Sequence, residues 1–175
     1  MLISDRLNID LKAIAEDRME FGLLLDDEYF SCLDDAEIEH GKVNASVSIR
    51  KAAEGEFVLS LSVDGVVTVA CDLCLDDMEQ SIEGEASFAV KLGTEPSEDD
   101  SLIVVDENQG ILPLGWLIYE TIVLAIPIKH VHAPGKCNAA MTKKLEELSA
   151  TRSGDGAGDA VDPRWAELLN IKDSN

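Results

Sequence analysis

Basic residues are scarce in this chain. Its 175 residues include 14 Lys and Arg against 35 Asp and Glu, which gives a formal net charge of −21 at pH 7. So much negative charge repels phosphates, and it argues against a surface built to track a nucleic-acid backbone. The chain is still apolar enough to fold, because 46% of its residues are hydrophobic and 28% are charged. Its length suits one domain with room for an appendage.

The few basic residues are also unevenly distributed. Residues 1–128 contain 7 Lys and Arg and 28 Asp and Glu, whereas residues 129–175 contain 7 of each. The excess negative charge therefore belongs entirely to residues 1–128, which we call the acidic body. Such a body attracts basic partners, whereas the neutral remainder of the chain can contact either kind of molecule.

A secretory leader and long hydrophobic runs are not evident. The opening residues, MLISDRLNID, are charged and lack an apolar core followed by a small-residue cleavage site. The longest apolar run is 111–128, and it has Glu120 near its middle and prolines at 113 and 127. A carboxylate at that position opposes insertion into a bilayer. We therefore expect a buried core helix instead of a membrane span, and a cytoplasmic protein.

Sequence signatures of common enzymes are missing. There is no phosphate-binding G-x-x-x-x-G-K-[ST], no G-x-G-x-x-G, no G-x-S-x-G and no H-E-x-x-H. His40 stands at a strand entrance and is interpreted as an exposed turn residue. The acidic pairs along the chain lack the spacing of an EF-hand loop and are interpreted as solvated faces. We therefore expect a protein without enzymatic activity.

Cysteine is limited to four positions. Without a leader, thiols indicate a reducing compartment, where spaced cysteines are more often metal ligands or reactive groups than disulfides. Cys71 and Cys74 form a C-x-x-C pair, Cys137 stands far downstream, and Cys32 has no neighbour of ligand type. Cys32 is therefore interpreted as an ordinary core or surface thiol.

A metal site is the chemistry that these thiols support best, because zinc binds four tetrahedral ligands and the segment KHVHAPGKC adds histidines near Cys137. We predict a Cys3His zinc site formed by Cys71, Cys74, His132 and Cys137. His132 is favoured over His130 because residues 133–135, Ala-Pro-Gly, can turn the chain back toward Cys137. The alternatives are neighbouring thiols that bind no metal and a redox C-x-x-C, a motif that usually opens a helix near a βαβ unit.

Alternating apolar residues predict a sheet in the first hundred residues. Apolar side chains share one parity within 43–50, within 57–69 and within 82–92, which is the period of strands with one buried face. The two longest strands are expected to be antiparallel, with the C-x-x-C at their connection and a bulge or bend at Asp64–Gly65. Shorter elements are expected at residues 7–11, 19–25, 26–35 and 102–105.

Helices are expected in the second half. Pro113 is tolerated in a first turn and opens a largely apolar helix that covers the sheet, and Asn138 is a candidate N-cap for a second helix near 139–148. The fold class is α+β: a curved antiparallel sheet or partial β-barrel covered by a buried helix, with a helical C-terminal tail. The expected divisions are a single α+β domain at 1–149, a flexible linker at 150–161 and a short C-terminal helix at 162–175.

The C-terminal helix has a clear start, with Asp162 as cap and Pro163 in the first turn. A helix this short is marginal by itself. We therefore expect its apolar side to dock either on its own domain or on a partner. That predicted partner-binding side consists of Trp165, Leu168 and Leu169.

Three segments together resemble the YceD family, which is named for accumulation of the large ribosomal RNA subunit. They are GVVTVACDLCLDDMEQSIEG at 65–84, ETIVLAIPIKHVHAPGKCN at 120–138 and DPRWAELLNI at 162–171. The resemblance implies a bacterial cytoplasmic protein that supports normal accumulation of large-subunit ribosomal RNA without an established enzymatic activity. Many members have a second cysteine pair where this chain has His132 and Cys137.

The leading function is therefore a non-enzymatic factor in large ribosomal subunit biogenesis. We expect the acidic body to bind a basic ribosomal protein or a pre-ribosomal particle, with no membrane partner. One alternative is direct contact with ribosomal RNA through Lys129, Lys136, Lys143, Lys144 and Arg152. Others are a zinc-dependent hydrolase using the cysteines and a bound water, and a structural subunit retained on mature particles.

Overall fold

A computed structural model describes residues 7–33, 38, 40–95 and 102–148. Residues 1–142 form one compact unit, and a second unit begins at Lys143. The predicted linker and the predicted C-terminal helix, with Trp165, Leu168 and Leu169, lie outside the described residues. In the part of the chain that the structure describes, the elements are β1 (Asn8–Asp10), η1 (Leu11–Ala13), β2 (Arg18–Leu25), α2 (Asp27–Ser31), β3 (Gly41–Ala53), β4 (Glu56–Ala70), β5 (Asp77–Gly93), β6 (Leu102–Asp106), β7 (Ile111–Pro113), α3 (Leu114–Leu124) and α4 (Ala139–Leu148).

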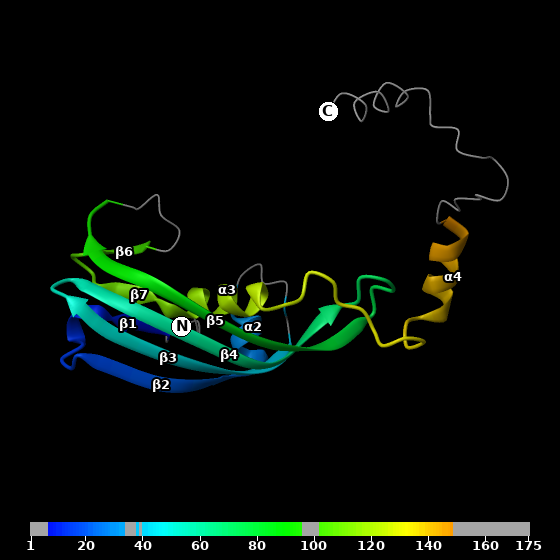
Figure 1. Ribbon diagram of the computed structural model, residues 1–175, viewed down its shortest axis with the longest axis horizontal. Coiled ribbons are helices and arrows are strands. Elements are labelled where there is room, and N and C mark those ends of the chain that lie inside the picture. The colour runs from blue at the N-terminus through cyan, green and yellow to red at the C-terminus, as the bar shows by residue number, and fades with distance from the viewer. Residues whose placement is uncertain (1–6, 34–37, 39, 96–101, 149–175) are drawn as a thin grey trace, which may run out of the picture. The chain divides into compact units, whose positions relative to one another are not determined.

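The main sheet has five strands in the order β2-β3-β4-β5-β6 (Figure 1). The pairs from β2 to β5 are antiparallel, as the alternating pattern predicts, whereas β6 joins β5 in parallel. Within the described residues the sheet is curved but not closed into a barrel, since β2 and β6 are its edges. The α+β class with a curved sheet is thus confirmed.

Strands β4 and β5 form a long hairpin whose pairing runs without interruption from Glu56↔Lys91 to Ala70↔Asp77. Of the bulge or bend expected at Asp64–Gly65, the bulge is wrong, because both residues stay in register with β3 and with β5. Glycine is needed there for a different reason: a Cβ on Gly65 would lie 2.3 Å from the carbonyl oxygen of Lys42. The strands therefore approach too closely for any larger residue.

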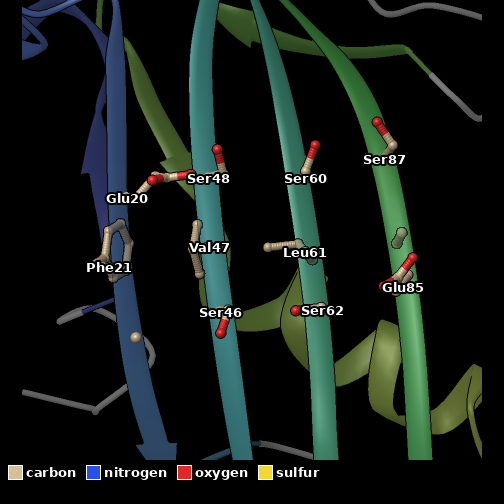
Figure 2. A pocket seen from close by; sticks show the side chains of 12 residues that line it. Glu20, Phe21, Ser46, Val47, Ser48, Ser60, Leu61, Ser62, Glu85 and Ser87 are labelled. Atoms are coloured by element: carbon tan, nitrogen blue, oxygen red, sulfur yellow. The ribbon is translucent and has the colours of Figure 1, made fainter.

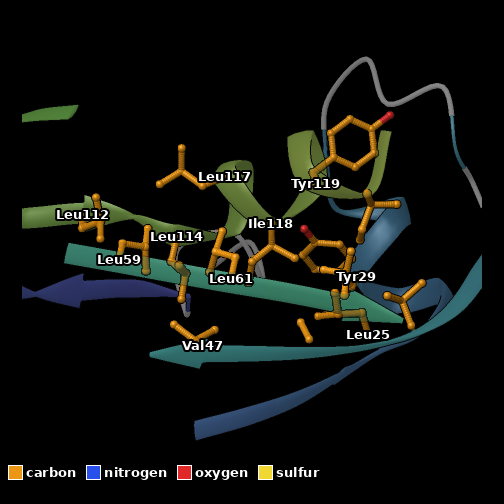
Figure 3. Close-up of a cluster of buried hydrophobic side chains, with 14 of the residues drawn as sticks. Leu25, Tyr29, Val47, Leu59, Leu61, Leu112, Leu114, Leu117, Ile118 and Tyr119 are labelled. Carbon is orange, nitrogen blue, oxygen red and sulfur yellow. The ribbon is translucent and has the colours of Figure 1, made fainter. Parts of the chain in front are cut away.

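Helix α3 covers one face of the sheet, and the core lies between them. Leu114, Ile118 and Ile122 of this helix are fully buried, together with Leu59 and the other inward residues of β3 and β4. Figure 3 shows Leu114 and Ile118 beside Leu59 and Leu61. The 111–128 run is therefore mainly a core helix, as predicted. No helix in the described residues is long and apolar enough to span a membrane.

Two short features of the fold were not expected. Residues Ile111–Pro113 form β7, which pairs with β1 in a separate two-stranded sheet. Gly84 of β5 faces the end of α3, where an added Cβ would lie only 2.8 Å from the Cβ of Ala125.

The predicted cap of α4 is confirmed, because the Asn138 side chain accepts hydrogen bonds from the first backbone N–H groups of α4.

Candidate metal centre

The far end of the β4–β5 hairpin turns through residues 71–76. The Cys71 N–H donates to the Asp76 carbonyl at 2.9 Å, and the Leu75 N–H donates to the Cys71 carbonyl at 2.9 Å. Leu75 has a φ of 61°, a left-handed conformation that is uncommon outside glycine. This tight turn leaves both Cys71 and Cys74 buried and brings their side chains to one cluster of ligand atoms.

A second loop, after α3, supplies the other two side chains. The Lys136 N–H donates to the Ala133 carbonyl at 2.9 Å, and Gly135 has a φ of 79° that suits glycine. The predicted turn through residues 133–135 is thus confirmed. It brings His132 and Cys137 near each other, with the His132 Nδ1 4.0 Å from the Cys137 Sγ.

The two loops meet, although their ligand residues are about sixty positions apart in the sequence. The Cys71 and Cys137 sulfurs are 3.9 Å apart, and the Cys74 Sγ is 3.3 Å from the His132 Nδ1. All four ligand atoms lie within 4.8 Å of one another. The structure therefore gathers the whole predicted set of Cys71, Cys74, His132 and Cys137.

These separations fit a zinc ion. Zinc–sulfur bonds of about 2.3 Å and zinc–nitrogen bonds of about 2.05 Å at tetrahedral angles place two sulfurs about 3.8 Å apart, and sulfur and nitrogen about 3.6 Å apart. The observed 3.9 Å between the Cys71 and Cys137 sulfurs is close to the first value, and the sulfur–nitrogen distances of 3.3 and 4.0 Å bracket the second. Three thiolates and an imidazole are also ligands that zinc prefers. The residues present thus fit this metal.

His130, the alternative histidine, contacts an acidic neighbour of the cysteines instead. Its backbone N–H donates to the Asp72 Oδ2 at 2.8 Å, and its ring Nε2 lies 3.6 Å from the Asp72 Oδ1. The Asp72 N–H in turn donates to the His130 carbonyl at 3.0 Å. His130 therefore joins the two loops through Asp72, and the choice of His132 as the nearby ligand agrees with the geometry.

A second clamp between the loops was not foreseen. The Asn138 Nδ2 donates to the Asp76 Oδ2 at 3.2 Å, while the Asn138 Oδ1 caps α4. Asp76 is therefore not merely part of a solvated acidic face. The sequence does contain a signal for these clamps, since Asp72 and Asn138 each directly follow a cysteine of the cluster.

Two thiols of the cluster have shifted pKa values. Burial opposes ionisation of Cys71, but hydrogen bonds from the backbone at Cys74, His132 and Leu73 outweigh it and lower its pKa to about 6. Burial and the neighbouring thiols Cys71 and Cys74 raise the pKa of Cys137 to about 11. Zinc binds thiolates, so one ligand is already ionised near neutral pH and another would release its proton on binding.

Other predicted residues lie apart from this cluster. Cys32 is half-buried at the end of α2, and His40 is exposed with its Nδ1 3.4 Å from an Asp27 oxygen. Across the described ranges, no second group of three His, Cys, Asp or Glu side chains comes together as a candidate metal site. Within the described residues, the side chains that could hold a metal are therefore concentrated in the 71–76 turn and the 127–138 loop.

Comparison with known proteins gives one match. A family model described as Large ribosomal RNA subunit accumulation protein YceD matches residues 59–172, which is more than half of the chain. The match includes both loops of the candidate metal centre. No curated protein and no solved structure matches the chain.

Proposed function

The chain belongs to the YceD family of large ribosomal RNA subunit accumulation proteins, and from this membership we propose that it is a non-enzymatic factor in large ribosomal subunit biogenesis. Its partner is a basic ribosomal protein, bound through the acidic body. Binding would shield the basic protein from RNA until assembly. Long-range attraction between opposite charges would also raise the rate of encounter.

The position of the charge is the observation that supports this partner. The exposed face of β5 presents four carboxylates, which belong to Asp77, Glu79, Glu83 and Glu85. The only base from residue 52 to residue 128 is Lys91, and it lies 3.6 Å from the Glu56 carboxylate. A surface of this sign favours Lys- and Arg-rich proteins and disfavours phosphates.

Affinity purification from cells, with mass spectrometry of protein and sequencing of RNA, tests this function. We expect basic large-subunit ribosomal proteins to be enriched at near-physiological salt. Recovery of ribosomal RNA without any protein partner would contradict the proposal and favour direct RNA contact, which filter binding to ribosomal RNA fragments would then measure. Stable retention on mature particles would instead indicate a structural subunit.

We also propose that Cys71, Cys74, His132 and Cys137 bind one zinc ion with a structural role. The four side chains complete a tetrahedral set from the protein alone, whereas catalytic zinc keeps a position open for water. Cys71 and Cys74 are fully buried, which also limits access of a substrate. The arrangement therefore favours a metal that joins the hairpin end to the 127–138 loop over a zinc-dependent hydrolase.

Elemental analysis tests the metal. Protein produced in zinc-supplemented medium should contain one zinc per chain, and Cys71→Ser should remove it and lower the free energy of unfolding by roughly 3 kcal/mol or more. Cys32→Ser is the matched control, because it also replaces a free thiol but lies outside the cluster. Absence of stoichiometric metal, with equal stability of the two variants, would exclude the site.

A further inference from the structure

The face of the main sheet that points away from α3 carries an unusual set of small side chains. The register places Ser46 opposite Ser62, and Ser48 opposite Ser60, on the central strands β3 and β4. Ser60 is in turn opposite Ser87 of β5. Serine is a poor strand former compared with threonine or valine. Five serines at the centre of an open face therefore call for a reason other than strand stability.

These serines line a hollow of about 750 Å³ across strands β2 to β5. We call it the serine groove, and Figure 2 shows its two rows of hydroxyl groups with Glu20 at one end and Glu85 at the other. In the described part of the chain none of the five serine hydroxyls has a hydrogen-bond partner. The groove thus presents hydroxyl groups that are available to another molecule.

The charged side chains beside the groove make one of its borders acidic. On one side, Asp64 of β4 lies directly opposite Glu83 of β5, and Glu85 follows two residues later on the same face. Like charges directly opposite each other destabilise a sheet. The Asn44 Nδ2 donates to the Asp64 Oδ2 at 3.1 Å, but no ion pair in the described ranges involves Asp64, Glu83 or Glu85. On the other side Arg18 is paired with Glu20, which leaves Arg50 as the opposing cation there. Lys42 of β3 lies on the same face diagonal to Asp64, but within the described residues it forms no ion pair with these carboxylates. Cations from a partner would relieve the repulsion at the acidic side.

The serine hydroxyls favour an extended chain. Its backbone N–H and C=O groups are free to bond with them, whereas those of an α-helix are already paired within the helix. Four neighbouring strands span about 14 Å from β2 to β5, which an extended segment crosses in about four residues. In an extended chain, side chains at alternate positions point the same way. Two basic residues on one side of such a segment can therefore reach the acidic border together.

We propose that the serine groove binds an extended segment of a protein partner that bears Lys or Arg, with its cations on Asp64, Glu83 and Glu85. The segment's backbone lies over the serine hydroxyls, which donate to its carbonyl groups or accept from its N–H groups. This proposal rests on the proposed function, because it names the part of the acidic body that meets the basic ribosomal protein. It differs from that function in assigning the contact to one face of the sheet.

Fluorescence anisotropy with the full-length chain tests the groove. The probe is a fluorescein-labelled peptide of alternating Lys and Thr, twelve residues long, and a twelve-nucleotide single-stranded RNA is the comparison. Glu83→Gln with Glu85→Gln should weaken peptide binding about tenfold, as expected for the loss of two exposed charge contacts. Glu16→Gln with Glu54→Gln is the matched control. It changes the net charge equally at exposed positions outside the groove, and it should alter binding less than about twofold.

Steric filling separates local binding from long-range attraction. Ser48→Gln with Ser62→Gln fills the groove without changing charge and should also weaken the peptide, while the unfolding midpoint by urea confirms that the sheet remains intact. Absence of peptide binding, equal loss in the two charge pairs, full binding to the filled groove or preferential binding of the RNA would each overturn the proposal. Purification from cells then distinguishes a failure of the groove proposal from a failure of the proposed function. If ribosomal proteins are recovered equally with wild type and with E83Q/E85Q, the groove is wrong and the function stands. If wild type recovers none, the function itself fails.

Discussion

The two histidines of the 127–138 loop contact different groups, so replacing each one should change zinc binding differently. His132 lies 3.3 Å from the Cys74 sulfur, whereas His130 contacts Asp72. We expect His132→Ala to abolish stoichiometric zinc because one of four ligands is lost. His130→Ala should weaken zinc affinity by about 10- to 100-fold, the usual effect of removing a group that orients ligands. Competition with a chromophoric chelator measures both affinities.

Cobalt replacement provides a control for the identity of the ligand. The His130→Ala protein should keep the visible absorption bands of tetrahedral cobalt with three thiolates and one imidazole, since its ligand set is unchanged. The His132→Ala protein should lose this spectrum or change its band positions. The opposite pattern would show that His130 is the ligand and that the loop rearranges on metal binding.

Leu75 is a second residue whose conformation leads to a prediction. It is the one non-glycine residue with a positive φ in the described ranges, and its side chain is 67% exposed. Leu75→Gly should therefore raise the free energy of unfolding of the metal-loaded protein by about 0.5–1 kcal/mol, because glycine removes the left-handed strain and little burial is lost. Urea titration monitored by circular dichroism measures the change.

Leu73→Gly is the matched control for Leu75. The two leucines flank Cys74 in the same turn, but Leu73 has no positive φ and is 45% exposed. Glycine there should destabilise the protein by about 1 kcal/mol through added freedom of the unfolded chain. Equal destabilisation by both substitutions would mean that the turn is not strained at Leu75.

Single-residue chemistry explains which parts of the site could be predicted. The C-x-x-C spacing and the short turn between His132 and Cys137 are local, so the sequence alone indicates the four candidate ligands. The Asp72–His130 and Asp76–Asn138 contacts each join residues about sixty positions apart. Asp72 and Asn138 each directly follow a cysteine, which marks them as neighbours of the site. Their partners, however, depend on how α3 returns the chain to the hairpin end, and no local spacing encodes that.

At the scale of elements, close packing between α3 and the sheet depends on Gly84. An added Cβ there would lie 2.8 Å from the Cβ of Ala125, which is fixed to the backbone and cannot rotate away. Gly84→Ala should therefore destabilise the protein by about 1–3 kcal/mol, the usual effect of overpacking. Equilibrium unfolding in urea measures this loss.

Gly22→Ala is the corresponding control in the same sheet. Its added Cβ would come no closer than 3.9 Å to the Ala45 carbonyl oxygen, an ordinary contact. Alanine in a strand costs less conformational entropy than glycine, so this variant should be neutral or more stable by about 0.5 kcal/mol. If Gly84→Ala were equally neutral, α3 would have to pack more loosely on β5 than the distances show.

Long elements were predicted better than short ones for a physical reason. In β3, β4 and β5 one face is buried over many residues, so alternation of side chains specifies the strand and its register. The short strand expected within residues 7–11 is present as β1, whereas β7 has three residues, too few for a period, and ends at Pro113, which the sequence indicates as a helix start. The parallel pairing of β6 likewise leaves no mark in its own five residues.

At the scale of the whole molecule, the charge of the acidic body should control how fast a basic partner is captured. All of the net charge of −21 belongs to residues 1–128. Attraction of this kind acts over about 10 Å at 0.1 M salt and is screened as salt rises. It mainly changes the association rate constant, whereas dissociation depends on short-range contacts that salt alters less.

We therefore expect the association rate constant for the basic ribosomal protein recovered from cells to fall by about tenfold or more between 25 and 300 mM salt. The dissociation rate constant should change much less. Stopped-flow fluorescence at a series of salt concentrations measures both.

The Glu16→Gln/Glu54→Gln variant should shift the association rate slightly at low salt and not at all at high salt, because it removes charge without touching the serine groove. An association rate that is independent of salt would mean that shape and apolar contacts capture the partner, and that the acidic body serves some purpose other than attraction.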